Sequence, residues 1–87
     1  MVKDSEMAKP SPTHNGAPEL IALGNSIRKI RLDLDLSQEG LANLIGIDRS
    51  YMGGIERGEH NIALINIVRI AEALKVKASD LLKAAKL

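Results

Sequence analysis

The sequence predicts an all-α domain of five short helices, and three observations support that fold class. Apolar residues recur at intervals of three and four, which is the spacing of one helix face. No segment shows the regular alternation of apolar and polar residues that is typical of a strand. Serine, aspartate and glycine between residues 37 and 58 are placed to begin and end two short helices.

The first predicted helix covers residues 18–34. Pro18 suits its first turn, since the N–H that proline lacks would have no helical partner there. Its inward face consists of Leu20, Leu23, Ile27, Ile30 and Leu34. Residues 1–17 contain almost no large apolar residue, so we expect a disordered tail there and a folded domain in residues 18–87.

The second and third helices are predicted from their end residues. Ser37 can cap the second helix by accepting a hydrogen bond from its first turn, and Gly46 can end it in the left-handed conformation. Asp48 can cap the third helix, and Gly58 ends it. Their inward residues are Leu41, Ala42, Leu44, Ile45, Ile47, Met52 and Ile55. Two helices joined by about three to four residues form a helix-turn-helix motif, whose second helix fits the major groove of DNA.

Two further helices are predicted at residues 64–74 and 79–86. The buried face of the first consists of Leu64, Ile67, Ile70, Ala71 and Leu74. The second carries Leu81, Leu82 and Ala85. Both patterns follow the helical period.

Composition restricts the class of protein. The 87 residues suit one small domain, whose core must be aliphatic because the chain has no Trp, no Phe and a single Tyr. The absence of cysteine excludes disulfides and thiolate metal sites, and the cytoplasm is the expected location. No apolar run approaches the roughly 18 residues of a membrane-spanning helix. Nothing resembles a nucleophile–base pair or a metal-binding cluster, so we expect neither an enzyme nor a cofactor.

Three short motifs carry a resemblance to a known family. They are S-Q-E-x-L-A from Ser37, I-E-R-G from Ile55 and I-A-E-A-L from Ile70. Residues 23–82 resemble the lambda-repressor-like helix-turn-helix domain of bacterial and phage regulators, and residues 48–61 most resemble restriction–modification controller proteins. The resemblance implies a transcriptional regulator that binds a palindromic operator in double-stranded DNA as a homodimer.

Arg49, Ser50 and Gly53 share the side of the third helix opposite its apolar face. Arginine in the first turn of a recognition helix can donate two hydrogen bonds to guanine, so Arg49 is the candidate for reading a base. Ser50 is a second, smaller candidate. Gly53 and Gly54 weaken this helix, which leaves two interpretations open. Either DNA orders the helix, or Gly53 lets the backbone approach DNA closely.

Other candidate DNA contacts flank these residues. The resemblance implies that Gln38 anchors the sugar–phosphate backbone, where a helix N-terminus also favours phosphate. It also implies a DNA-contacting tyrosine at Tyr51. Asn61 can donate a hydrogen bond to phosphate, and Asn66 and His60 are weaker candidates of the same kind.

Arg31 and Glu56 match an ion pair that the family uses to tie the first helix to the end of the recognition helix. The resemblance therefore implies that this pair orients the third helix without contacting a base.

The dimer surface is expected in the fourth and fifth helices. Their apolar residues exceed what one small core needs, and the candidates are Ile65, Val68, Leu81, Leu82 and Leu87. One helix-turn-helix motif reads few base pairs, so twofold repetition is the usual arrangement.

Charge gives only weak support for DNA binding, because the net charge is +1 and residues 37–61 contain more acidic than basic side chains. Two alternatives therefore stay open. One is the antitoxin of a toxin–antitoxin pair, whose tail would fold on its toxin. The other is a protein-interaction module that does not bind DNA.

Overall fold

The structure is a computed structural model that describes residues 13–87. In this range the chain forms helices and no strand. The helices are α2 (Pro18–Asp33), α3 (Gln38–Ile45), α4 (Arg49–Glu56), α5 (Leu64–Ala73) and α6 (Ala78–Ala84). For the described part of the chain, the predicted all-α fold with five helices is therefore confirmed. Residues 1–12 of the expected tail lie outside the described range.

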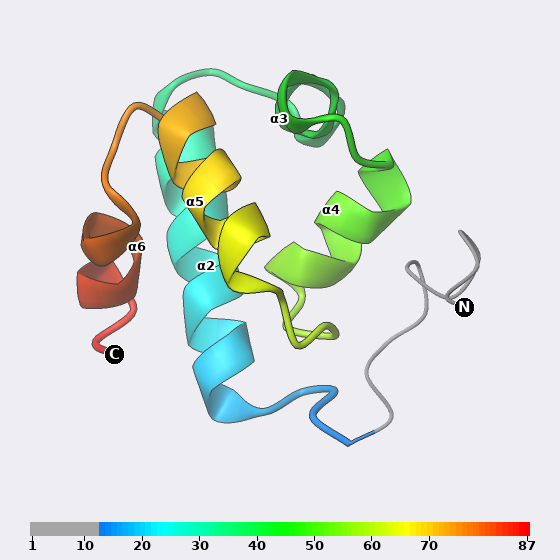
Figure 1. The fold of residues 1–87 in the computed structure, drawn as a ribbon, viewed down its shortest axis with the longest axis vertical. Helices are drawn as coiled ribbons and strands as arrows, with labels where there is room; N and C mark the ends of the chain where they lie inside the picture. The colour runs from blue at the N-terminus through cyan, green and yellow to red at the C-terminus, as the bar shows by residue number, and fades with distance from the viewer. Residues whose placement is uncertain (1–12) are drawn as a thin grey trace.

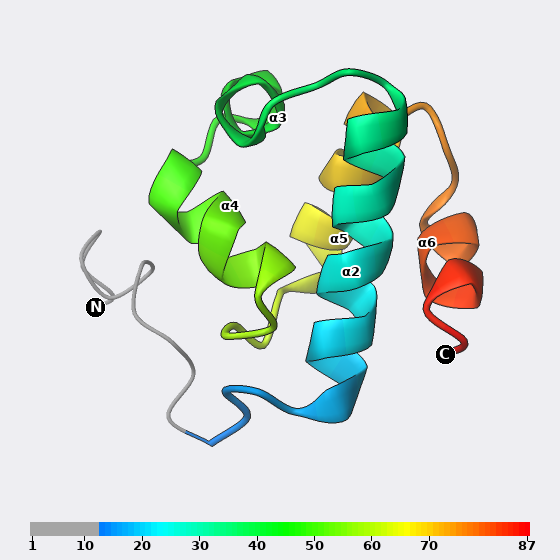
Figure 2. The same ribbon diagram turned by 180° about the vertical axis from the view of Figure 1, so that it is seen from behind.

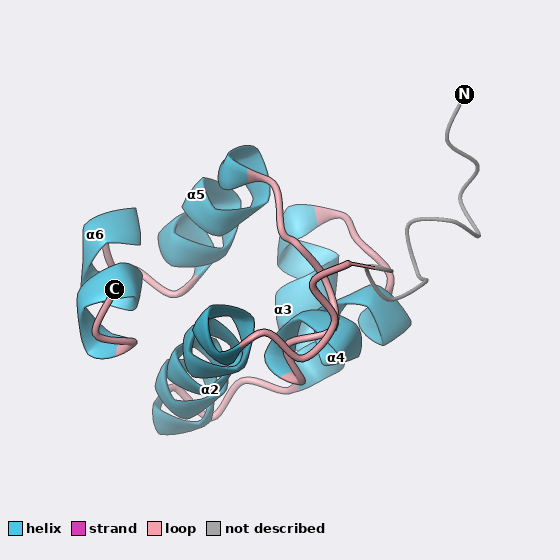
Figure 3. Cartoon of the chain, turned by 90° about the horizontal axis from the view of Figure 1, so that it is seen from below, coloured by secondary structure: helices cyan, strands magenta, loops and turns pink. Residues whose placement is uncertain are grey.

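The longest helix, α2, lies in the middle of the molecule (Figure 1). It contacts α4 on one side and α6 on the other, an arrangement that is also visible from behind (Figure 2). Seen from below, α5 lies across from α2, and α3 and α4 lie at the end of the molecule away from α6 (Figure 3). Contacts of α3 with both α4 and α5 join the two sides.

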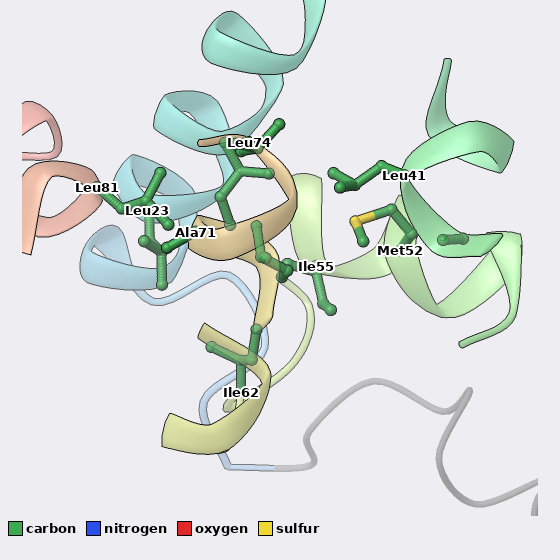
Figure 4. Packing of buried hydrophobic residues seen from close by; sticks show 11 residues of the cluster. Leu23, Leu41, Met52, Ile55, Ile62, Ala71, Leu74 and Leu81 are labelled. Carbon is green, nitrogen blue, oxygen red and sulfur yellow. The ribbon is translucent and has the colours of Figure 1, made fainter. Parts of the chain in front are cut away.

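All five helices or their connections contribute to one aliphatic core (Figure 4). Its buried members are Leu23, Ile27, Leu41, Ala42, Met52, Ile55, Ile62, Ile70, Ala71, Leu74 and Leu81. The expectation of inward side chains is wrong for Leu44, Leu64 and Leu34, which are 64%, 69% and 47% exposed. Leu44 and Leu64 lie on the outer sides of their helices, and Leu34 follows the end of α2.

The helix ends follow most of the sequence expectations. Ser37 Oγ accepts a hydrogen bond from the N–H of Gly40 at 2.8 Å, and so caps α3. Gly46 and Gly58 adopt φ angles of 73° and 79°, which glycine reaches without steric cost. Asp48 occupies the capping position of α4, but its side chain makes no capping hydrogen bond. The expected cap is therefore present at Ser37 and absent at Asp48.

The segment before α2 contacts the end of the helix-turn-helix unit. The N–H of Gly16 donates a hydrogen bond to the carbonyl oxygen of Gly58 at 2.8 Å. The N–H of Ala17 donates to the carbonyl oxygen of His14 and closes a turn. Gly16 and Ala17, the last two residues of the expected tail, thus both form backbone hydrogen bonds within the described chain.

Leu81 belongs to the core of the single chain. Its side chain is 0% exposed, and its carbonyl oxygen accepts a hydrogen bond from Ser26 Oγ at 3.0 Å. These contacts attach α6 to α2. The expectation that Leu81 lies in a dimer interface is therefore wrong, because α6 already uses this side chain to pack on its own chain.

Candidate DNA-binding surface

The first turn of α4 is the exposed edge of the helix-turn-helix unit. Arg49 and Ser50 are exposed there, whereas Met52 and Ile55 are buried against the core. The helix therefore has one face that fixes it to the domain and one that is open to a ligand. This division agrees with the predicted role of its first turn.

Arg31 and Glu56 form a buried ion pair between α2 and α4. Arg31 Nε and Nη2 donate to Glu56 Oε2 and Oε1 at 2.6 and 2.9 Å, and Nη1 donates to the carbonyl oxygen of Leu36 at 2.7 Å. The hydrogen bond to Glu56 raises the pKa of Arg31, although burial acts in the opposite direction. Both residues are about 5% exposed or less, so the end of α4 is tied firmly to α2.

Gln38 extends this network to the start of α3. Its Nε2 donates a hydrogen bond to Glu56 Oε1 at 3.0 Å, so one carboxylate receives donors from α2 and from α3. Gln38 is half-buried and lies in the first turn of α3. Its amide group is therefore held in place before any ligand binds.

The two glycines of α4 are both covered by side chains of the same chain. A Cβ atom at Gly53 would lie 3.0 Å from Arg57 Nη1 and 3.5 Å from Gln38 Oε1. A Cβ atom at Gly54 would collide with the imidazole of His60. Each glycine thus makes room for a neighbouring side chain, which neither interpretation from the sequence had considered.

His60 packs against α4. It is only 6% exposed, and its ring meets the ring of Tyr51 edge-on, with centroids 4.7 Å apart and planes inclined by 67°. The space above Gly54 receives this imidazole. The expectation of a phosphate contact at His60 therefore conflicts with its burial, while Tyr51 remains half-exposed beside it.

Asn61 and Asn66 lie in different surroundings. Asn61 is exposed in the loop after α4, and Asn66 is half-buried in the first turn of α5. Asn61 also lines a shallow depression together with His14 and Glu19.

Arg57 is an exposed cation on this surface that was not among the candidate DNA contacts predicted from the sequence. Arg57 Nε and Nη2 donate to Glu59 Oε2 and Oε1 at 2.7 and 3.2 Å. This hydrogen bonding raises the pKa of Arg57 and lowers the pKa of Glu59. Arg57 follows Gly53 by four positions, which places both on one face of a helix, and that spacing was the available signal.

The described residues contain no cluster of three or more side chains suited to a metal ion. In residues 13–87, no helix combines the length and the apolar character needed to cross a membrane.

Several known proteins are similar to this chain in sequence and in fold. A family model described as helix-turn-helix matches residues 27–81. Control protein C.MunI of a Mycoplasma species is 40% identical over 62 residues, which cover 70% of this chain and 84% of that protein. Control protein C.BamHI of Bacillus amyloliquefaciens is 43% identical over 63 residues, covering 71% of this chain and 78% of that protein.

Comparison with solved structures identifies the same class of protein as these sequence relatives. The crystal structure of the restriction–modification controller protein C.AhdI from Aeromonas hydrophila aligns with a TM-score of 0.71 and 46% identity, covering 72% of this chain and 96% of that one. The family match covers more than half of the chain. The chain therefore belongs to the helix-turn-helix family of DNA-binding transcriptional regulators.

Proposed function

We propose that this protein is a homodimeric regulator that binds a palindromic operator and controls the genes of a restriction–modification system in the cytoplasm. The observation that carries the proposal is the exposed first turn of α4, with Arg49 and Ser50 at its edge and Gln38 fixed nearby by the Arg31–Glu56 pair. The control of restriction–modification genes rests on the similarity to controller proteins.

The proposed contacts divide into base reading and backbone anchoring. Arg49 reads a guanine in the major groove, with Ser50 beside it. Gln38, Tyr51, Asn61 and Asn66 bind phosphates and set the register. Gly53 has no side chain and leaves space for the ends of the Arg57 and Gln38 side chains.

Dimerisation is supported by the outer side of α5. Leu64 and Ile65 are 69% and 56% exposed, and Val68 is half-buried one turn further along. Leu82 is also half-buried, and Leu87 is 55% exposed. Apolar side chains of this size are stabilised by burial, and a second copy of the chain would bury them symmetrically.

Selection from a random library of DNA duplexes tests the proposal. We expect the full-length protein to enrich a twofold-symmetric sequence whose half-sites are centred about 10 bp apart, or a multiple of that spacing. Sedimentation of the complex should give two chains per site. Enrichment of no sequence, or of an asymmetric site bound by one chain, would contradict the proposal.

A further inference from the structure

Arg57 directly follows the last residue of α4 and continues the face that carries the proposed base-reading residue. Arg49, Gly53 and Arg57 follow one another at intervals of four positions, so they line one side of the helix and its last turn. The side chain of Arg57 is 60% exposed. It is therefore a cation on the outer surface of the helix-turn-helix unit.

Gly53 provides the space in which this guanidinium group lies. The position that a Cβ atom would take at residue 53 is 3.0 Å from Arg57 Nη1. The same position is 3.5 Å from Gln38 Oε1. The guanidinium of Arg57 and the amide of Gln38 thus both lie close to this glycine.

Glu59 holds the guanidinium from the other side. Arg57 directs Nε and Nη2 at the two carboxylate oxygens of Glu59, at 2.7 and 3.2 Å. A guanidinium has five N–H donors, so this pair uses two and leaves others for a second anion. The carboxylate of Glu59 therefore holds the edge of the guanidinium that carries Nε and Nη2, and it leaves Nη1 unused.

We propose that Arg57 is a further DNA-contacting residue, and that Gly53 and Glu59 position its guanidinium beside Gln38 to bind a backbone phosphate. The inference rests on the proposed function, because it assumes that Gln38 and the first turn of α4 face DNA. A planar guanidinium suits a phosphate because two N–H groups can bond two oxygens at once. Glu59 is a positioning residue and does not itself bind DNA.

The direction in which Glu59→Gln changes DNA affinity distinguishes positioning of Arg57 from simple electrostatics. Glu59→Gln removes a negative charge next to DNA, so charge alone would increase affinity. If Glu59 positions Arg57, the same substitution should weaken binding to the selected operator about threefold, because the hydrogen bonds that hold the guanidinium are weakened. In an Arg57→Gln background, Glu59→Gln should cause no further loss.

Three more variants complete the test, each measured by titration on the selected operator across a range of salt concentrations. Arg57→Gln should lower affinity about tenfold and reduce the salt slope by about 0.9 for each protomer, as expected for one lost phosphate contact. Arg57→Lys and Gly53→Ala keep the charge but misplace it, so they should lower affinity while leaving the slope nearly unchanged. Far-UV circular dichroism and thermal midpoints of all variants establish that they fold.

The possible failures are distinguishable. If Arg57→Gln keeps wild-type affinity and salt slope while Arg49→Ala and Gln38→Ala weaken binding, the inference about Arg57 is wrong and the proposed function stands. If Glu59→Gln increases affinity, Glu59 competes with DNA and does not position Arg57. If the wild-type protein selects no sequence, the proposed function and this inference both fail.

Discussion

Gly24 of α2 lies directly against the backbone of Glu56 at the end of α4. A Cβ atom at this position would collide with the carbonyl oxygen of Glu56 and lie 2.6 Å from that of Ile55. Both obstacles are main-chain atoms, which cannot move without shifting a helix. Residue 24 must therefore be a glycine, because α2 and α4 cross too closely for any side chain there.

Gly24→Ala should destabilise the protein by about 1–3 kcal/mol, the usual cost of overpacking a core. Helix propensity alone predicts the opposite, since alanine is better than glycine in a helix by roughly 0.5–1 kcal/mol. Urea denaturation followed by circular dichroism measures the difference. Gly53→Ala is the matched control, because its new methyl group meets only the flexible ends of the Arg57 and Gln38 side chains and should not lower stability. Equal effects at both glycines would contradict the steric explanation.

Breaking the Arg31–Glu56 pair should have a large effect on stability. Arg31→Met leaves the buried carboxylate of Glu56 without its main cation, and loss of one partner of such a pair costs about 3–5 kcal/mol. That is a large part of the roughly 5–15 kcal/mol that stabilises a typical domain. Denaturant titration gives the value. A double replacement by Met and Leu should cost much less, and a single replacement that costs under about 1 kcal/mol would contradict the buried-pair assignment.

Arg49→Ala and Gln38→Ala should weaken DNA binding in different ways. Loss of Arg49 should cost about 1–3 kcal/mol on the operator and remove the preference at one symmetric base position. Loss of Gln38 should weaken operator and scrambled DNA by similar factors, because a phosphate contact carries no direct sequence information. Titration of both variants on both DNAs measures this contrast. Similar losses on the two DNAs for Arg49→Ala would show that Arg49 does not read sequence.

Ile65→Lys should dissociate the proposed dimer. A charged side chain at this exposed position on α5 would have to be buried in the interface, which is costly unless the charge finds a partner. Sedimentation velocity should show monomers, and operator binding at low concentration should be lost. Leu44→Lys is the control, since Leu44 is similarly exposed but lies on α3. If both variants remain dimeric, the interface lies elsewhere.

Features governed by neighbouring residues could be predicted from the sequence. The Ser37 cap, the left-handed Gly46 and the proline at the start of α2 depend on a few consecutive residues. The helical periods likewise located each helix to within about two residues. The chain also turns with positive φ at Asp35 and Lys75, where no glycine marks the helix end.

Features that depend on packing between distant segments could not be predicted in the same way. Leu81 has the same apolar character whether it meets α2 of its own chain or a second copy, and only the fold decides between them. His60 was expected at the surface because nothing local shows that Gly54 leaves room for its ring. The Arg31–Glu56 pair, 25 positions apart, was indicated only by resemblance to a family.

The contact between Tyr51 and His60 gives the molecule a spectroscopic probe of its own. Tyr51 is the only tyrosine, and the chain has no tryptophan, so tyrosine emission reports on α4 alone. The phenol ring lies against a buried imidazole, and Tyr51 as a whole is half-exposed. Any ligand or substitution that moves the recognition helix relative to the loop after it will change the surroundings of this single fluorophore. The protein therefore needs no attached dye for the motion of this helix to be followed in solution.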